Sequence, residues 1–263
     1  MSSAISLLFD IFGLPALIAL VVAGITTWLN LRFVRSDRAR RSTLPIAAVF
    51  AFWAGYLLLP RSFAALGPQE GRSWTWIPYI GLITAVLAAS LPRSPRWYIW
   101  IPISLVTAAL TAYLLAPTWP VYGFNRIPLV IFLTLYLLAI DIPLQGLPDR
   151  CRHAHFLVGI VGGICVLNSL AIGAMISANF AKLSALAAGT FMGTWLTLYL
   201  SSKGRSVAFG PLLALFAPLA GGIAWIACVE LDPQPWLLVT PLLSLCAWLL
   251  VWQPAPFGPR QIS

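Results

Sequence analysis

Long apolar stretches separated by short polar or basic loops run through the chain. Each stretch covers about 17–22 residues, the length with which an α-helix crosses about 30 Å of hydrocarbon. The apolar residues are continuous and lack the alternation of a transmembrane β-strand. The pattern predicts an all-α, polytopic bundle of about nine spans, at 11–29, 44–59, 75–91, 97–116, 127–146, 156–177, 183–200, 207–228 and 236–252.

Composition supports this prediction. Hydrophobic residues make up 60% of the 263 positions and charged residues only 9%, whereas a soluble domain carries about 25% charge. The predicted loops are no longer than roughly 15 residues, which leaves no room for a separate folded module. We therefore expect residues 1–263 to form a single integral membrane domain with short loops and no extramembrane domain.

Basic residues concentrate in alternate loops, and this asymmetry predicts the orientation. Lys and Arg accumulate in short cytoplasmic loops, so the N-terminus is expected outside and the C-terminus inside. We expect the net charge of +9 to reflect this topology and contact with anionic lipid headgroups, with no nucleic-acid partner. Short loops and arginine asymmetry favour a bacterial inner (plasma) membrane. The arginines of the first loop, 31–43, are Arg32, Arg35, Arg38, Arg40 and Arg41.

Asp141 is the only carboxylate well inside an apolar stretch. An ionised Asp at the bilayer centre costs about 2.5–3.5 kcal/mol on insertion scales, and such residues often mark ion or proton pathways. However, Asp141 lies only about two turns before the next loop, and Pro143 can end the helix early. We therefore weigh a translocation site against the favoured interpretation, a helix-end carboxylate that contacts lipid headgroups or pairs with an arginine.

Two further features allow a translocation site or plain packing. Asn168 lies near the middle of its predicted span, where an amide binds solute or, more commonly, forms interhelical hydrogen bonds. Pro218, Gly221 and Gly222 interrupt the 207–228 span. Transporters use broken helices of this kind to present backbone groups to substrate, but Pro and Gly are also frequent in ordinary membrane helices. A simple kink is the favoured interpretation.

Small residues recur every four positions in two consecutive spans. Gly159 and Gly163 lie in the 156–177 span, and Gly189 and Gly193 in the 183–200 span. Small residues at this period allow a close helix crossing. Because the connecting loop is short, we expect the two spans to pack against each other as a hairpin. An interface with another subunit is the alternative.

Metal and cofactor motifs are absent from the sequence. Asp149, Cys151, His153 and His155 alternate in one predicted cytoplasmic loop, but Arg150 and Arg152 lie between them and the spacing matches no zinc motif. Convergent titratable groups, which catalysis normally requires, are nearly missing from the spans. We predict no metal, no cofactor and no catalytic residue, and we rank an intramembrane enzyme last.

Two functional classes remain. The first is a non-catalytic membrane subunit or scaffold of a larger complex, which fits the scarcity of polar groups in the spans and the small-residue faces. The alternative is a translocator of a small solute, ion or lipid that uses Asp141, Asn168 and the Pro218–Gly222 break. The depths of these groups differ by roughly 10 Å at 1.5 Å per helical residue, which counts against a shared site.

Overall fold

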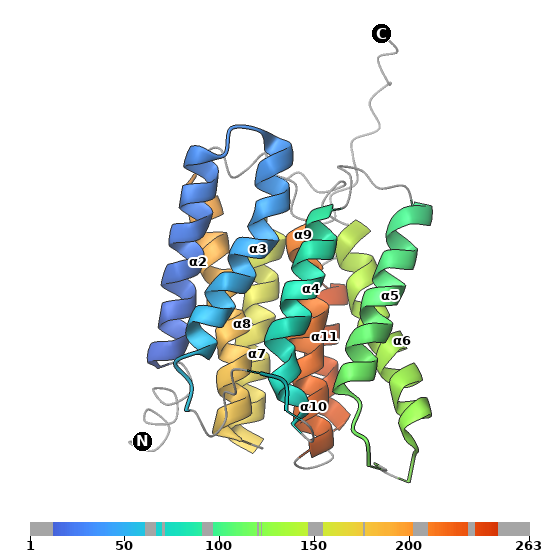
Figure 1. The fold of residues 1–263 in the computed structure, drawn as a ribbon. Helices are drawn as coiled ribbons and strands as arrows, with labels where there is room; N and C mark the ends of the chain where they lie inside the picture. Colours follow the sequence, from blue (N-terminus) through green and yellow to red (C-terminus); the bar gives the residue numbers. More distant parts are fainter. Residues whose placement is uncertain are drawn as a thin grey trace.

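A computed structural model describes residues 13–60, 67–69, 72–90, 97–119, 121, 123–146, 155–175, 177–201, 210–230 and 235–246. Nearly all of these residues are helical, and none belongs to a strand beyond two isolated bridges. The helices stand side by side in one bundle, and helices consecutive in the chain run in opposite directions (Figure 1). The all-helical prediction is therefore confirmed.

The described helical segments lie within or overlap the apolar stretches of the sequence. They are α2 (Leu14–Phe33), α3 (Asp37–Tyr56), η1 (Ser73–Trp76), α4 (Ile77–Ser90), α5 (Trp97–Leu115), α6 (Arg126–Gly146), α7 (His155–Met175), α8 (Ala178–Leu200), α9 (Gly210–Leu213), η3 (Ala217–Gly221), α10 (Gly222–Glu230), η4 (Pro235–Leu238) and α11 (Val239–Leu242). Six segments of the described chain are long and apolar enough to cross a membrane: 14–33, 73–90, 126–145, 155–174, 178–200 and 210–229. These helices are compatible with a multi-pass membrane protein.

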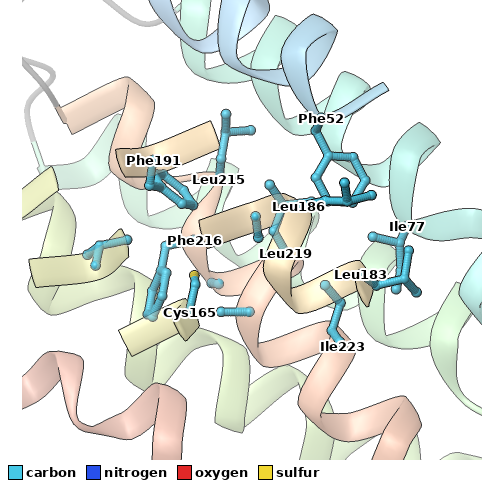
Figure 2. Packing of buried hydrophobic residues seen from close by; sticks show 14 of the residues in the cluster. Phe52, Ile77, Cys165, Leu183, Leu186, Phe191, Leu215, Phe216, Leu219 and Ile223 are labelled. Carbon is cyan, nitrogen blue, oxygen red and sulfur yellow. The ribbon is translucent and has the colours of Figure 1, made fainter. Parts of the chain in front are cut away.

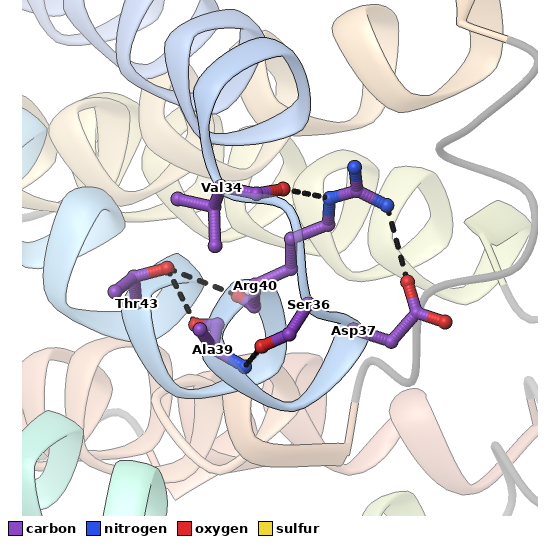
Figure 3. A network of polar contacts seen from close by, with 6 residues as sticks. All are labelled: Val34, Ser36, Asp37, Ala39, Arg40 and Thr43. Carbon is purple, nitrogen blue, oxygen red and sulfur yellow. Dashed lines mark hydrogen bonds and ion pairs between the residues drawn. The ribbon is translucent and has the colours of Figure 1, made fainter.

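The first basic loop is shorter than predicted, because α3 already begins at Asp37. The Ser36 side chain caps this helix by accepting a hydrogen bond of 3.1 Å from the Ala39 backbone N–H. Arg40 lies 3.1 Å from the Asp37 carboxylate and donates a 2.7 Å bond to the Val34 carbonyl (Figure 3). The turn is thus held by its own polar groups, and most of the predicted loop is helix.

α6 ends at Gly146, the predicted end of its span, so Pro143 does not end the helix early. The next helix but one, α8, extends beyond its predicted start. α8 begins at Ala178 after a cap by Ser177, which accepts a bond from the Asn179 N–H. Lys182, expected in a loop, therefore lies in the first turns of α8.

The interrupted segment α9–η3–α10 occupies the centre of the bundle. Within the most apolar 18 residues of this segment 94% are buried, against 33% in the corresponding stretch of α2. Its side chains meet residues from several helices (Figure 2). The buried residues labelled there are Leu215, Phe216, Leu219 and Ile223 of the central segment, with Phe52, Ile77, Cys165, Leu183, Leu186 and Phe191 around them. The other helices surround this segment and expose large apolar side chains on their outer faces.

α7 and α8 pack against each other, but the glycines contribute differently from the prediction. A Cβ atom at Gly159 would lie 2.8 Å from Trp195 Nε1 of α8, so Gly159 belongs to the expected hairpin. Gly189 and Gly193 instead face α2, where the nearest atoms are the backbone carbonyl oxygens of Ala16 and Leu20.

The fourth glycine of the pattern makes no close contact. A Cβ atom at Gly163 would have nothing within 4 Å. The small residues of α8 therefore allow a close approach of α2, a helix far away in the sequence, and do not serve the hairpin.

Candidate site around Asp141

Asp141 lies inside the bundle, on the last turns of α6. Its side chain is only 6% exposed. Gln145, one turn later, donates a 2.7 Å hydrogen bond to Asp141 Oδ2 and a 3.2 Å bond to Ser104 Oγ of α5. Within the described residues Asp141 Oδ1 is buried without a hydrogen-bond partner and Asp141 forms no ion pair. The following loop with Arg150 and Arg152 lies outside the described residues, so pairing with an arginine or contact with lipid headgroups stays a prediction.

A small cavity of about 30 Å³ borders Asp141. A water molecule needs roughly 10–15 Å³ measured in this way, so the cavity has room for about two waters and for no larger organic solute. Its polar lining residues are Asp141 and Gln145 of α6, Ser104, Thr107 and Thr111 of α5, and Thr84 of α4; the central segment contributes Ala214, Ala217 and Pro218. We call this space the Asp141 cavity.

The break in the central segment lies on this cavity. Pro218 has no N–H, so it cannot donate to the carbonyl of Ala214 as an α-helix requires. The residues Ala217–Gly221 form a π-helical turn, in which the Gly222 N–H bonds to the Ala217 carbonyl. Pro218 thus joins Asp141 at one cavity, a juxtaposition that the predicted depths counted against. π-Helical turns inside α-helices are frequent at functional sites.

Asn168 contacts the same break but does not line the cavity. Its amide Nδ2 donates to Ser184 Oγ at 3.1 Å and to the Ala220 carbonyl at 3.5 Å. Its Oδ1 accepts a 2.7 Å bond from Thr240 Oγ1. Asn168 therefore links α7 to α8, η3 and α11. This network is the interhelical bonding favoured from the sequence, and it holds the π-helical turn in place.

Sequence reasoning missed the hydroxyl groups of α4 and α5. Ser104, Thr107 and Thr111 share one face of α5, at the i, i+3, i+7 spacing, and Thr84 of α4 lines the cavity with them. We call these four residues the hydroxyl row. The spacing was present in the sequence, but Ser and Thr often bond to their own helix, as Thr107 does to the Ile103 carbonyl at 2.8 Å. The hydroxyl row differs from other helical Ser and Thr residues only because all four line the same cavity as Asp141.

The hydroxyl row leads away from Asp141 toward a wider surface basin. Thr84, Thr107 and Thr111 also border a narrow apolar space without room for a water molecule. Beyond it, a basin of about 250 Å³ is lined by Arg72, Tyr113 and Arg126 among others. Arg126 donates a 2.8 Å bond to the Tyr113 carbonyl, and its Cζ lies 4.3 Å from the centroid of the Tyr113 ring. We call this space the Arg72–Arg126 basin.

Only one residue of the histidine-containing set is described. Asp149, Cys151 and His153 lie outside the described residues, and His155 is the buried first residue of α7, with its ring 4.4 Å from that of Phe156. No cluster of three or more His, Cys, Asp and Glu side chains suited to a metal ion occurs in the described part of the chain.

The chain matches no known family model, and no curated protein or solved structure resembles it significantly. The candidate site therefore depends on the geometry of this chain alone.

Proposed function

We propose that this protein translocates a small ion or polar solute across a membrane and that the Asp141 cavity is its binding site. The observation that carries the proposal is the buried Asp141 carboxyl, whose Oδ1 has no partner and which lines a cavity together with the broken central helix. An intramembrane carboxyl is costly when ionised. Gln145 is a neutral partner that binds only one of its oxygens. A carboxyl with one oxygen left unbonded is suited to bind and release an ion or a polar solute.

The central segment supplies the second argument. Broken helices at the middle of transporters present backbone groups to the substrate, while neighbouring helices rock around the site. Here the π-helical turn containing Pro218 is almost wholly buried and borders the cavity. Its other side is held by Asn168. This arrangement favours movement of the π-helical turn while Asn168 and α7 stay in place.

The alternative, a non-catalytic subunit or scaffold, receives less support from the geometry. Its main argument was that the small-residue faces bind another subunit. Gly159, Gly189 and Gly193 contact helices of the same chain, which leaves only Gly163 of this set for a partner protein. If another protein copurified with this chain at a fixed ratio, a membrane subunit would become the favoured function.

We also propose the number of spans and the orientation of the chain in the membrane. The six long apolar segments, together with α3, α5 and the 235–246 segment, support about nine spans of one membrane domain. Arginine asymmetry supports an N-out, C-in orientation, and we propose the inner membrane of a bacterium.

The first turn of the bundle supports contact with anionic lipid headgroups. Arg32, Arg35 and Arg38 are exposed. The Arg32 Cζ lies 5.1 Å from the centroid of the Trp28 ring, and tryptophan is common at the membrane interface. Arg40 already binds Asp37 and Val34 within the turn. We therefore propose that Arg32, Arg35 and Arg38 make the main contribution to headgroup binding.

Cysteine accessibility tests the proposed site. Ser104→Cys places a thiol at the Asp141 cavity, and Val106→Cys places one on the exposed apolar face of the same helix at similar depth. Both are made in a background in which the four native cysteines are replaced by alanine. Silver ion, a small water-soluble cation that binds thiols and fits a space of this size, is applied to protein in lipid vesicles and should react with Ser104→Cys and spare Val106→Cys. Equal protection of both positions would mean that water does not reach the cavity and would refute the proposal.

A further inference from the structure

We propose that the species exchanged at Asp141 is a single proton and that the hydroxyl row forms half of its path. This inference rests on the proposed translocation function and specifies its substrate. Among the described residues that line the cavity, Asp141 is the only one with an ionisable side chain. A single positive charge neutralises an ionised Asp141. A divalent cation would leave one charge unbalanced in an apolar interior, at high cost.

The dimensions of the path favour a proton over a metal ion. Thr84, Thr107 and Thr111 line the Asp141 cavity and also an adjoining space that has no room for a water molecule, so a hydrated metal ion cannot pass along the row as it stands. Each hydroxyl both donates and accepts a hydrogen bond, and a proton moves along such groups by exchange of bonds. Waters of the Asp141 cavity connect the row to the carboxyl.

The other lining groups also fit a proton better than a metal ion. Apart from the polar groups already named, the cavity wall consists of Leu87, Ala88, Ile103, Ala108 and Leu137 with the residues of the break. Calcium and magnesium ions are held by about six or more oxygen ligands. Here the polar side chains come from α4, α5 and α6, and Asp141 supplies the only carboxylate among the described lining residues. Such a wall suits a carboxyl that gains and loses a proton.

The two ends of the path lie near the two ends of the bundle. Asp141 is about 7.5 Å from the end of α6 at Gly146 by helical rise, which gives one short exit past Gln145. In the other direction, Thr111 lies two positions before Tyr113, a residue of the Arg72–Arg126 basin. Arg72 and Arg126 add positive charge there. At the water interface salt screens this charge over about 8–10 Å, so it raises a modest barrier to a proton.

The exchange step conserves atoms and charge. A hydronium ion in the cavity gives its proton to Asp141 Oδ1, which yields a neutral carboxylic acid and a water molecule. The O–H bond then breaks toward a water on the other side, which regenerates the carboxylate and a hydronium ion there. Gln145 holds Oδ2 through both states, so Oδ1 is the oxygen free to react. Membrane potential and pH difference supply the driving force, and no oxidant or reductant takes part.

Proton flux into vesicles tests this inference. Purified full-length protein is reconstituted with a trapped pH dye in sodium-free potassium buffer and diluted into sodium-free buffer of low potassium, so that potassium efflux through valinomycin imposes an inside-negative potential. The wild type should acidify the lumen. Asp141→Asn keeps the size and the acceptor for Gln145, and it should lower the initial rate by about 100-fold, as expected for loss of a positioned proton-transfer group. Asp141→Glu should restore part of the rate.

Matched variants separate the path from general damage. Thr107→Val removes one hydroxyl of the row and should slow acidification. Thr26→Val removes a hydroxyl that bonds to its own helix in the same way, at 2.8 Å to the Val22 carbonyl, and should leave the rate unchanged. Asp37→Asn removes an acid at the exposed start of α3 and should also have no effect. Unfolding temperatures of all variants in detergent check their folding.

The outcomes distinguish this inference from the proposed function. Acidification that is lost in folded Asp141→Asn supports the proton. Equal acidification by wild type and Asp141→Asn overturns it. Radioactive sodium uptake without sodium-free acidification also overturns it but leaves translocation intact. If Ser104→Cys reacts and no proton flux occurs, only the substrate assignment fails. If neither occurs, both proposals fail.

Discussion

Replacement of Gly193 by alanine is expected to loosen the bundle where α2 crosses α8. A Cβ atom at this position would lie 2.9 Å from the Leu20 carbonyl carbon and closer still to the carbonyl oxygen. Both atoms belong to the backbone, so no side-chain rotation relieves the contact. The two helices must move apart, and the 3.3 Å bond from Thr197 Oγ1 to the Gly24 carbonyl lies beside the displaced region.

The expected magnitude follows from two opposing effects. Overpacking a well-packed interior costs typically about 1–3 kcal/mol. Alanine in place of glycine inside a helix stabilises the folded state by about 0.5–1 kcal/mol. A net loss of about 1–2 kcal/mol remains, which for a chain of this size corresponds to a lower melting temperature by about 2–8 °C.

Thermal unfolding of the purified protein in mild detergent measures this change. Gly163→Ala is the matched control, because a Cβ atom there would have nothing within 4 Å. We expect Gly163→Ala to melt at the wild-type temperature or slightly above it. If Gly193→Ala is tolerated as well as Gly163→Ala, the close crossing of α2 and α8 is wrong.

Two further substitutions test the support of the break and the lipid contact. Asn168→Ala removes the hydrogen bonds to Ser184, Ala220 and Thr240. At about 0.6 kcal/mol per interhelical bond, the free energy of unfolding in detergent should fall by about 1–2 kcal/mol. An unchanged melting temperature would contradict the network. The double substitution Arg35→Gln with Arg38→Gln should weaken binding of anionic lipid by about 1 kcal/mol per arginine. Native mass spectrometry measures this as the amount of phosphatidylglycerol retained. Equal retention by wild type and variant would show that these arginines do not bind the headgroups.

The helices themselves were largely predictable from the sequence. An apolar stretch of membrane length has few alternatives to a helix, because every buried backbone group must be bonded within it. The ends were less certain. Ser36 and Asp37 form a helix-start signal, but the surrounding arginines were interpreted as a loop, so the start of α3 was placed too late.

Contacts between distant parts of the chain were not predictable in the same way. The four-residue period of Gly189 and Gly193 shows that a helix packs closely there, but it does not show which helix, and α2 lies far away in the sequence. Asp141 stood out as an isolated acid. Its environment depends on α4, α5 and the central segment, and no local pattern at Asp141 carries that information.

The most direct test of translocation is labelling of Ser104→Cys from each side of the membrane separately. Vesicles with the protein in one orientation are exposed to silver ion either outside only or trapped inside only, with Val106→Cys as the control. A site that alternates between the two sides predicts modification of Ser104→Cys from both, and none of Val106→Cys. Modification from one side alone, or from neither, would contradict a translocation path through the Asp141 cavity.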